Sequence, residues 1–231
     1  MTRSYSTPQK YKEAWATLIQ QHLDAGCICP SNLAHVSLAF IILKADLVVL
    51  PRWVNEHRVL NANMVTDAHP LPRVDNILTD CAKGKIWSVI DMTNSFFQTR
   101  VHPDNIHLTA VTTPFGLYEW LAMPMGLCNS PAIHQRRMTA APREHISKIC
   151  HIYLDNIIIW SNTIAEHIQH IDTVMKALQK AQLYCNPNKC KFFQEEVDFL
   201  GHHISQCGIE PNSLKIDKVL NWPIPKSTTD V

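Results

Sequence analysis

One ten-residue stretch, residues 151–160, restricts the fold of this chain more than any other. It reads His-Ile-Tyr-Leu-Asp-Asn-Ile-Ile-Ile-Trp, with apolar runs rich in β-branched and aromatic residues on both sides of an acidic-amide pair. Such runs predict strands, and Asp and Asn tolerate the backbone angles of a two-residue turn, so the stretch predicts a tight β-hairpin. Asp155 is then either a simple turn former or an acid that a rigid hairpin holds at its tip.

A second apolar strand also ends on an acid. Residues 85–91 read Lys-Ile-Trp-Ser-Val-Ile-Asp and place Asp91 at the strand end, and the predicted strand over 149–155 ends in the same way on Asp155. If the two strands are neighbours, both carboxylates lie at one edge of the sheet. Hard oxygen ligands suit Mg²⁺, and two such ions stabilise the attacking and leaving oxygens of an in-line phosphoryl transfer. Strand-end aspartates are common, so spacing alone leaves this function open.

Length and composition set the outer bounds. With 231 residues, 46% hydrophobic and 18% charged, the chain has the composition of a globular protein with room for one domain or two packed subdomains. No run approaches the ~20 apolar residues of a membrane helix, so no membrane partner is expected. The first ten residues have no apolar core, so no secretory signal is expected, and we predict an intracellular protein with eight reduced cysteines. The net charge of +1 does not by itself indicate nucleic-acid binding.

Periodicity and turn residues predict an irregular alternation of helices and strands. Four helices are predicted. The first spans 8–23 and is ended by Gly26, and the second spans 71–81. The third spans 132–138, after a Ser130-Pro131 start and before Pro142, and the fourth is an amphipathic helix that opens with a Thr163–Glu166 capping box. The predicted strands are 36–42, 47–53, 85–91, an extended region over 101–113, 118–123, the hairpin within 146–160, and a closing hairpin formed by 192–193 and 197–204. Residues 61–72 are predicted as a loop, and Pro223 and Pro225 as the start of a tail. This order predicts an α+β or mixed sheet with helices on one face.

Six motifs in one order add a family resemblance. They are Arg58-Val-Leu-Asn61, His69-Pro-Leu-Pro-Arg-Val-Asp75, Ile90-Asp-Met-Thr-Asn-Ser-Phe-Phe-Gln98, Met123-Pro-Met-Gly-Leu127, Tyr153-Leu-Asp-Asn156 and Phe199-Leu-Gly-His-His203. From about Gly26 onward the chain closely resembles the reverse transcriptase of gypsy-type LTR retrotransposons, the type abundant in fungi. The resemblance implies an RNA-directed DNA polymerase with a fingers-palm architecture, whose ferredoxin-like palm has an antiparallel sheet with helices on one face.

The resemblance also implies domain boundaries. Residues 1–25 would form an N-terminal helix or extension, and residues 26–84, with part of 101–122, the fingers. Residues 85–204 would form the palm, which includes the catalytic hairpin over 149–160 and the primer-grip hairpin over 192–204. Residues 205–231 would start the connection to a thumb, and because the chain ends at Val231 we expect the thumb and the ribonuclease H to be lacking.

The roles implied for individual residues begin with the metal site. By resemblance, Asp91 and Asp155 bind two Mg²⁺ ions, with Mn²⁺ as a substitute, for transfer of a nucleotide to a primer 3′-hydroxyl. Asn156 stands where the family pattern Tyr-x-Asp-Asp has its second acid. Its amide oxygen can still ligate a cation, but the lost charge is expected to weaken metal binding and lower the rate.

Further matching positions would bind the substrates. For the incoming deoxynucleoside triphosphate, the resemblance implies the fingers cations Lys44 and Arg52, the aromatic Phe96 that would clash with a 2′-hydroxyl, and the turn at Met125 and Gly126. For the template and primer it implies the residues of the primer grip and two polar residues of one helix, namely Phe199, Leu200, Gly201, Gln135 and Arg136. The implied partners are an RNA or DNA template with its primer, and the rest of a Pol polyprotein (thumb, ribonuclease H, integrase). The implied locations are the cytoplasm, a virus-like particle and also the nucleus.

Departures from the family pattern leave an alternative. Besides Asn156, the chain has Cys29 and Cys128 where related elements tend to have arginine, and Pro142 interrupts a helix. Each Asp-to-Asn or Arg-to-Cys change is reachable by one transition of the cytosine-deamination kind, which suggests a decaying element copy. The alternative function is therefore a catalytically dead remnant or a co-opted nucleic-acid-binding fold. A zinc site is a weaker alternative, because its candidate ligands, Cys185, Cys190, His202, His203 and Cys207, do not have zinc-knuckle spacing.

Overall fold

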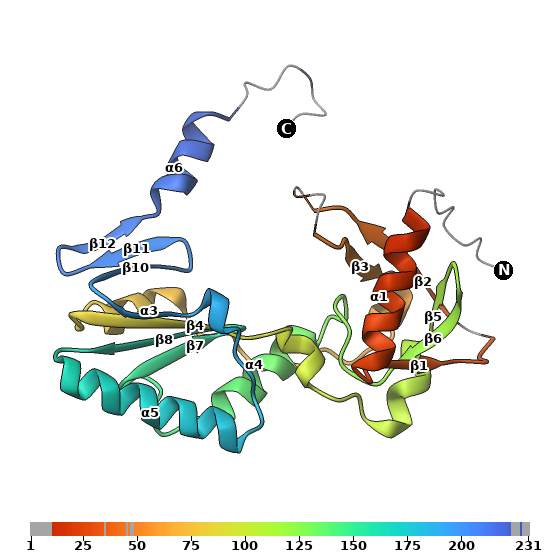
Figure 1. Cartoon of the computed structure of the whole chain (residues 1–231), viewed down its shortest axis with the longest axis horizontal. Helices are drawn as coiled ribbons and strands as arrows, with labels where there is room; N and C mark the ends of the chain where they lie inside the picture. The colour runs from red at the N-terminus through yellow and green to blue at the C-terminus, as the bar shows by residue number, and fades with distance from the viewer. Residues whose placement is uncertain (1–10, 35, 45, 47–48, 223–226, 228–231) are drawn as a thin grey trace. The chain divides into compact units, whose positions relative to one another are not determined.

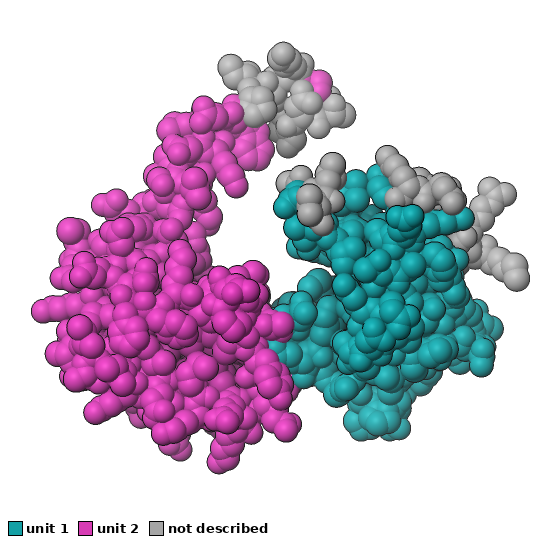
Figure 2. Space-filling view, viewed as in Figure 1, with its two compact units in different colours: residues 1–70, 94–136 teal, residues 71–93, 137–231 magenta. Residues whose placement is uncertain are grey.

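The computed structural model describes residues 11–34, 36–44, 46, 49–222 and 227. Its internal contacts divide the chain into two compact units, which Figure 2 colours teal and magenta: unit 1 comprises residues 1–70 and 94–136, and unit 2 residues 71–93 and 137–231. Pro8, Leu47, Val48, Pro223 and Pro225, which belong to predicted segments, lie outside the described residues. In the described part of the chain, every helix is too short or too polar to cross a bilayer.

Unit 1 contains a five-stranded sheet with the order β1-β6-β5-β2-β3 (Figure 1). The strands are β1 (Ile28–Pro30), β2 (Ser37–Ile42), β3 (Arg52–Asn55), β5 (Val111–Thr113) and β6 (Gly116–Trp120). The β2–β5 pair is parallel and the other pairs are antiparallel. The unit also holds the short helix α2 (Arg58–Ala62) and the 3-10 helices η2 (Ser95–Gln98) and η3 (Pro103–Thr109).

The core of unit 1 is built around three tryptophans. Helix α1 (Lys12–Asp24) contributes Trp15, whose ring centroid lies 4.8 Å from that of Trp53 in β3, and Trp53 lies 5.1 Å from Trp120 in β6. All three pack edge to face with Trp15 and Trp120 almost fully buried, an arrangement that aromatic quadrupoles favour. The amphipathic spacing that predicted a helix here is therefore the spacing that supplies the core.

Helix α1 ends at the predicted glycine. Gly26 has φ +60, its N–H donates to Leu23 O at 2.9 Å, and the N–H of Cys27 donates to His22 O at 2.8 Å. These two bonds and the left-handed residue between them form a Schellman motif, which satisfies carbonyls that the last helical turn would otherwise leave unpaired.

The predicted extended region over 101–113 is wrong for most of its length. Residues 103–109 form the 3-10 helix η3, and only Val111–Thr113 form a strand. Pro103 stands at the first helical position, where its missing N–H costs nothing, and the His102 ring accepts the Asp104 N–H at 3.3 Å. The predicted loop over 61–72 likewise begins within α2, which ends at Ala62.

Unit 2 contains a four-stranded antiparallel sheet with the order β7-β8-β4-β9. Its strands are β4 (Ile86–Asp91), β7 (Cys150–Tyr153), β8 (Asn156–Ser161) and β9 (Lys191–Gln194). Two helices flank it in Figure 1, α3 (Val74–Cys81) and α5 (Ile164–Lys180). The predicted antiparallel α+β sheet is confirmed.

The helices of unit 2 cover both faces of the sheet, which corrects the prediction of one face. Ile158 and Trp160 of β8 pack with Ile77 and Leu78 of α3, whereas the alternate residues Ile157 and Ile159 pack with Val174 and Leu178 of α5. Successive side chains of a strand point to opposite faces, so these two clusters lie on opposite sides. The unbroken apolar run in β8 is the physical sign of a strand buried on both faces.

The start of α5 follows the predicted capping box. The Thr163 hydroxyl accepts the Glu166 N–H at 3.3 Å, and the Glu166 carboxylate accepts the Thr163 N–H at 3.3 Å. Helix α4 (Ser130–Ala140) also begins at its predicted Ser-Pro start, and its residues fall in the sequence ranges of both units.

The predicted closing hairpin over 192–204 is wrong in its pairing. Strand β9, which contains Phe192 and Phe193, pairs with β4 in the four-stranded sheet. The hairpin itself is β10 (Glu196–Phe199) with β11 (His202–Ser205), and β12 (Gly208–Pro211) completes a separate three-stranded sheet before helix α6 (Ser213–Leu220). Within β9, Phe193 has φ +54 and its N–H donates to Ser88 Oγ at 3.1 Å, at the place where the pairing of β9 with β4 shifts register.

Candidate active site

The turn of the β7–β8 hairpin lies one residue earlier than predicted. Tyr153 pairs with Asn156, so Leu154 and Asp155 form the two-residue turn and Asn156 is the first residue of β8. Leu154 adopts φ +53, a left-handed conformation that costs a non-glycine residue about 1 kcal/mol or more. The strain of the turn therefore falls on Leu154 rather than on the Asp-Asn pair, and the acid next to it is held at the tip.

The two predicted acids meet at one end of the β4–β8 ladder. Asp91 is the register partner of Asn156, and the N–H of Met92 donates to Asp155 O at 3.0 Å. The side chain of Asp91 is 19% exposed, and Asp155 is also partly buried. The antiparallel pairing thus joins two acids that lie far apart in the sequence, as the strand-end pattern predicted.

Each acid has a polar partner already in place. The Asn156 side-chain amide donates to Asp155 Oδ1 at 3.0 Å. Lys189 Nζ lies 3.4 Å from Asp91 Oδ1, with the lysine 64% exposed. The amide nitrogen of Asn156 therefore orients the acid beside it, and Lys189 offsets part of the negative charge at this end of the sheet.

Sequence reasoning missed Lys189. It ends the 3-10 helix η4 (Pro187–Lys189), whose preceding residue Asn186 donates its N–H to Asp91 O at 2.8 Å and accepts the Asn188 N–H on its side chain at 3.2 Å. The Asn-Pro pair before Lys189 is a turn signal, so a turn was readable here. The position of this turn against Asp91 depends on tertiary contacts, which the turn signal does not reveal.

The donor set at this end of the sheet fits a hard divalent cation. Two carboxylates, Asp91 and Asp155, and the amide oxygen of Asn156 are oxygen donors, and Mg²⁺ in proteins commonly uses one or two carboxylates together with water and substrate phosphates. Among the described residues, no three His, Cys, Asp or Glu side chains gather to hold a metal.

The candidate zinc ligands Cys185, Cys190 and His203 make other contacts in the structure. Cys185 Sγ lies 3.9 Å from Met92 Sδ, and Cys190 Sγ lies 3.1 Å from Asn186 O. His203 Nδ1 lies 3.0 Å from Asp198 Oδ1, and the hydrogen bond to Asp198 raises the pKa of His203. These partners use the side chains for packing and ion pairing.

The residues predicted to bind the nucleotide belong to unit 1. Lys44 follows β2, and Arg52, which opens β3, is the register partner of Ile42 at the end of β2. Both side chains are exposed, and neither has an ion-pair partner among the described residues. Phe96 lies in η2, with its ring 4.9 Å from the ring of His134.

The Met125-Gly126 turn is shaped by contacts within unit 1. Gly126 has φ +100, and a Cβ there would lie 3.3 Å from the Asn55 carbonyl oxygen. The side-chain amide of Asn61 donates to Gly126 O at 2.9 Å. Glycine is therefore required by the backbone conformation and by the approach of another part of the chain, a reason that the family resemblance did not supply.

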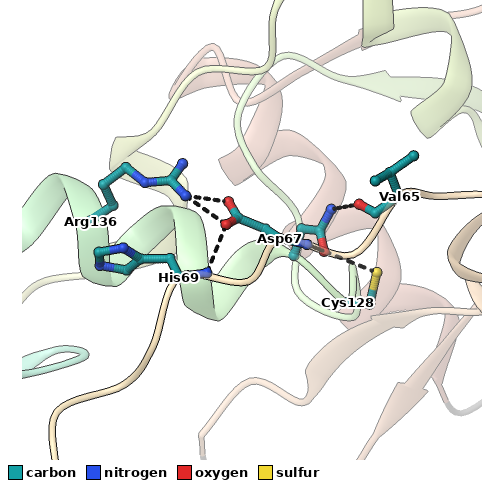
Figure 3. A network of polar contacts seen from close by, with 6 residues as sticks. Val65, Asp67, His69, Cys128 and Arg136 are labelled. Atoms are coloured by element: carbon teal, nitrogen blue, oxygen red, sulfur yellow. Dashed lines mark hydrogen bonds and ion pairs between the residues drawn. The ribbon is translucent and has the colours of Figure 1, made fainter.

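The two polar residues predicted near the template differ in exposure. Gln135 is completely buried. Arg136 is 54% exposed and bonds both oxygens of Asp67, at 2.6 and 2.7 Å (Figure 3). The His69 N–H and then Arg136 lower the pKa of Asp67. In this structure Arg136 secures the segment around Asp67, and the template roles of both residues stay predictions.

The predicted primer-grip residues form a second tight turn in unit 2. Phe199 pairs with His202, so Leu200 and Gly201 are the two turn residues, with φ +48 and +79. Two positive φ values define a type I′ turn, the kind that matches strand twist in a hairpin. Phe199 is buried against Val197 and Ile204, so it anchors the hairpin in the core.

Comparison with known proteins gives these motifs a context. Residues 49–204 match the family model for reverse transcriptase (RNA-dependent DNA polymerase). The whole chain is 34% identical to the retrovirus-related Pol polyprotein from transposon 297 of Drosophila melanogaster, and 97% of it is 31% identical to that from transposon gypsy of the same organism. The chain spans 22% of the length of each of these two relatives.

A solved structure shares the fold. The foamy viral protease-reverse transcriptase in complex with double-stranded DNA matches 99% of the chain with a TM-score of 0.90 and 25% sequence identity, and the match covers 40% of that protein. The predicted fingers-palm architecture is therefore confirmed at the level of the fold.

Proposed function

Because the chain belongs to the reverse transcriptase family, we propose that it carries out RNA-directed DNA synthesis as part of a Pol polyprotein of a gypsy-type LTR retrotransposon. The family consists of nucleotidyltransferases that use divalent metal ions. The observation that carries the proposal is the β4–β8 register, which brings Asp91 next to the hairpin tip that holds Asp155.

The proposed cofactor is Mg²⁺, as two ions, with Mn²⁺ as a substitute. Asp91 and Asp155 would hold the ions through their carboxylates, and Asn156 would contribute through its amide group. When bound, the ions would supply charge stabilisation for the attacking and leaving oxygens of the phosphoryl transfer. Asn156 keeps Asp155 oriented by its 3.0 Å hydrogen bond, so the site retains order at the position where the second acid is missing.

Unit 1 would bind the incoming deoxynucleoside triphosphate. Lys44 and Arg52 offer exposed positive charge for the phosphates, Phe96 a bulky ring against a 2′-hydroxyl, and the Met125-Gly126 turn a backbone surface without a side chain at Gly126. The hairpin residues Phe199, Leu200 and Gly201 would contact the primer. Gln135 and Arg136 would act near the template, Gln135 from inside the unit.

The proposed partners are an RNA or DNA template with its primer and the other parts of the polyprotein. The foamy viral relative in the structural comparison is bound to a DNA duplex, and the curated relatives are Pol polyproteins, which supports both. Thumb, ribonuclease H and integrase segments would then come from the same polyprotein. We place the activity inside the cell, in the cytoplasm or a virus-like particle, with the nucleus as a further location.

Primer extension on an RNA template tests this function. The chain is assayed with Mg²⁺ and with Mn²⁺ as wild type, Asp155→Ala and Asn156→Asp. Asp172→Ala is the matched control, because Asp172 is exposed on α5 and forms an ion pair with Lys176. We expect extension by the wild type, loss in Asp155→Ala, an increase in Asn156→Asp and no change in the control. Absence of extension by wild type and Asn156→Asp alike would reject the proposal in favour of a catalytically dead remnant.

A further inference from the structure

Asn61 uses both ends of its side-chain amide to hold the Met125-Gly126 turn. Its Nδ2 donates to Gly126 O at 2.9 Å, and its Oδ1 accepts the backbone N–H of Cys128 at 2.9 Å. The two bonded residues lie on either side of Leu127, so one side chain spans the turn as a neighbouring strand would. Asn61 itself is fixed by its own N–H, which donates to His57 O at 2.7 Å in α2.

A second asparagine, Asn129, lies next to the turn and bonds the backbone of the segment that contains Asn61. Asn129 Nδ2 donates to Val65 O at 2.7 Å, and its Oδ1 accepts the N–H of Asp67 at 3.0 Å. Figure 3 shows these bonds beside the Asp67–Arg136 ion pair. Segments 61–67 and 126–129 therefore each lend an asparagine that binds the backbone of the other, a reciprocal amide clamp.

The reciprocal amide clamp fixes the position of the Met125-Gly126 turn. A Cβ at Gly126 would meet the Asn55 carbonyl oxygen at 3.3 Å, so the turn already approaches the chain just before α2. Helix α2 has no buried side chain of its own, so packing contributes little to its position. The two hydrogen bonds of Asn61 are directional contacts that join α2 to the turn.

We propose that Asn61 is a positioning residue that sets the Met125-Gly126 turn for the incoming deoxynucleotide, an inference that rests on the proposed polymerase function. Only a primary amide of this length supplies one donor to Gly126 O and one acceptor for Cys128 N–H. Aspartate keeps the acceptor and loses the donor, and leucine of similar size loses both. Leaving these backbone groups unpaired would let the turn move, and the binding surface for the nucleotide would move with it.

The test compares Asn61→Leu and Asn61→Asp with Asn63→Ala. Asn63 is the matched control because its amide bonds Val59 O, at 2.8 Å, within its own helical segment. Hydrogen exchange of the peptide that contains Cys128 reports on the turn directly: we expect faster exchange at Cys128 in Asn61→Leu and near wild-type exchange in Asn61→Asp and Asn63→Ala. The KM for the deoxynucleotide should rise roughly tenfold in Asn61→Leu with kcat within about twofold, because two hydrogen bonds are lost.

Nucleotide affinity is also measured without turnover, on a primer-template whose primer ends in a dideoxynucleotide. If Asn61→Leu binds the nucleotide as wild type does, or lowers kcat and thermal stability with KM unchanged, Asn61 is merely structural and the inference is overturned. If wild type binds the nucleotide in the Asn61-dependent way but does not extend a primer, the inference stands and the polymerase function fails. If wild type binds no nucleotide, both are rejected.

Discussion

The ammonium group of Lys189 lies 3.4 Å from Asp91 Oδ1, so the chain itself places a positive charge on a carboxylate proposed to bind Mg²⁺. A cation that binds at Asp91 must compete with this charge. The lysine is 64% exposed, and an ion pair of that kind contributes at most about 1 kcal/mol. Removing the Lys189 charge should therefore change the affinity of Asp91 for a cation by a measurable amount.

We predict that Lys189→Ala tightens Mn²⁺ binding up to about fivefold, because the competing charge is removed. Titration followed by the electron paramagnetic resonance signal of free Mn²⁺ measures this. Lys191→Ala removes the same charge from an exposed position in β9 and should leave the affinity unchanged. Equal tightening in both variants would mean that only net charge matters and that the Asp91 contact does not.

Asn156→Asp should make the stability of the chain depend on Mg²⁺. The substitution removes the 3.0 Å hydrogen bond to Asp155 and places a third carboxylate opposite Asp91. Without metal and at low salt, we expect the melting temperature to fall by roughly 2–4 °C for a loss of about 1 kcal/mol. Added Mg²⁺ should raise it by more than in wild type.

Differential scanning fluorimetry with and without Mg²⁺ checks this prediction. Asn105→Asp adds the same charge on the exposed helix η3 of unit 1 and serves as the control. A Mg²⁺-dependent increase of the same size in both variants would contradict a site at Asp91, Asp155 and Asn156.

His167 should make unit 2 sensitive to acid. The side chain is fully buried, bonded to Ser88 Oγ at 2.7 Å and to Ser161 Oγ at 2.9 Å. Burial, with a smaller effect of His170, lowers the pKa of His167 to about 4. The unfolded chain binds a proton at higher pH than the folded one, so this contribution to stability is present above pH ~6.5 and is lost as the pH falls towards 4.

Urea denaturation at pH 7 and pH 5 tests the sign and size of this effect. The integrated contribution is on the order of 3 kcal/mol, and about half of it should be lost by pH 5. In His167→Gln, which can bond both serines but does not titrate, the pH dependence should shrink by that amount. His107→Gln, at an exposed position, is the control and should retain the wild-type slope. An unchanged slope in His167→Gln would refute the prediction.

Gly126→Ala should destabilise the chain more than Gly116→Ala. Both glycines have φ in the left-handed region, +100 and +129, so both substitutions introduce backbone strain. A Cβ at Gly126 also meets the Asn55 carbonyl oxygen at 3.3 Å, whereas nothing lies within 4 Å of one at Gly116. We expect the free energy of unfolding to differ between the two variants by about 1 kcal/mol, measured by chemical denaturation. Equal losses would show that strain alone requires glycine at Gly126.

Cys29→Arg should stabilise unit 1, because Cys29 is the register partner of Glu119 in the antiparallel β1–β6 pair. Burial and the charge of Glu119 raise the pKa of the Cys29 thiol, so the cysteine sits neutral beside an acid. Arginine there would form a cross-strand ion pair worth about 0.2–1 kcal/mol. A double-mutant cycle with Glu119→Gln measures the pair, and a coupling energy of zero would remove this structural support for a decayed arginine at Cys29.

Local sequence patterns predicted much of the fold because they act over a few residues. The hydrogen bonds of the Thr163–Glu166 capping box and of the Gly26 helix end join residues three to five positions apart, so a short stretch of sequence contains both partners. The apolar runs rich in β-branched and aromatic residues similarly located β4, β7 and β8, although they did not lead us to expect helices on both faces of the sheet. The wrong extended region over 103–109 arose because a proline and a histidine cap outweighed a weak strand pattern.

The sequence by itself determined that two apolar runs lead to Asp91 and Asp155 and that the motifs around them resemble those of a polymerase family. Only the tertiary structure decided that Leu154 occupies the turn, that Lys189 lies against Asp91, that Gln135 is buried and that Asn61 holds the turn at Gly126. The physical reason is the separation along the chain of the residues that make each contact. A cap or an alternating strand is fixed by neighbours along the chain, whereas these contacts join segments up to 98 residues apart whose meeting depends on strand register and packing.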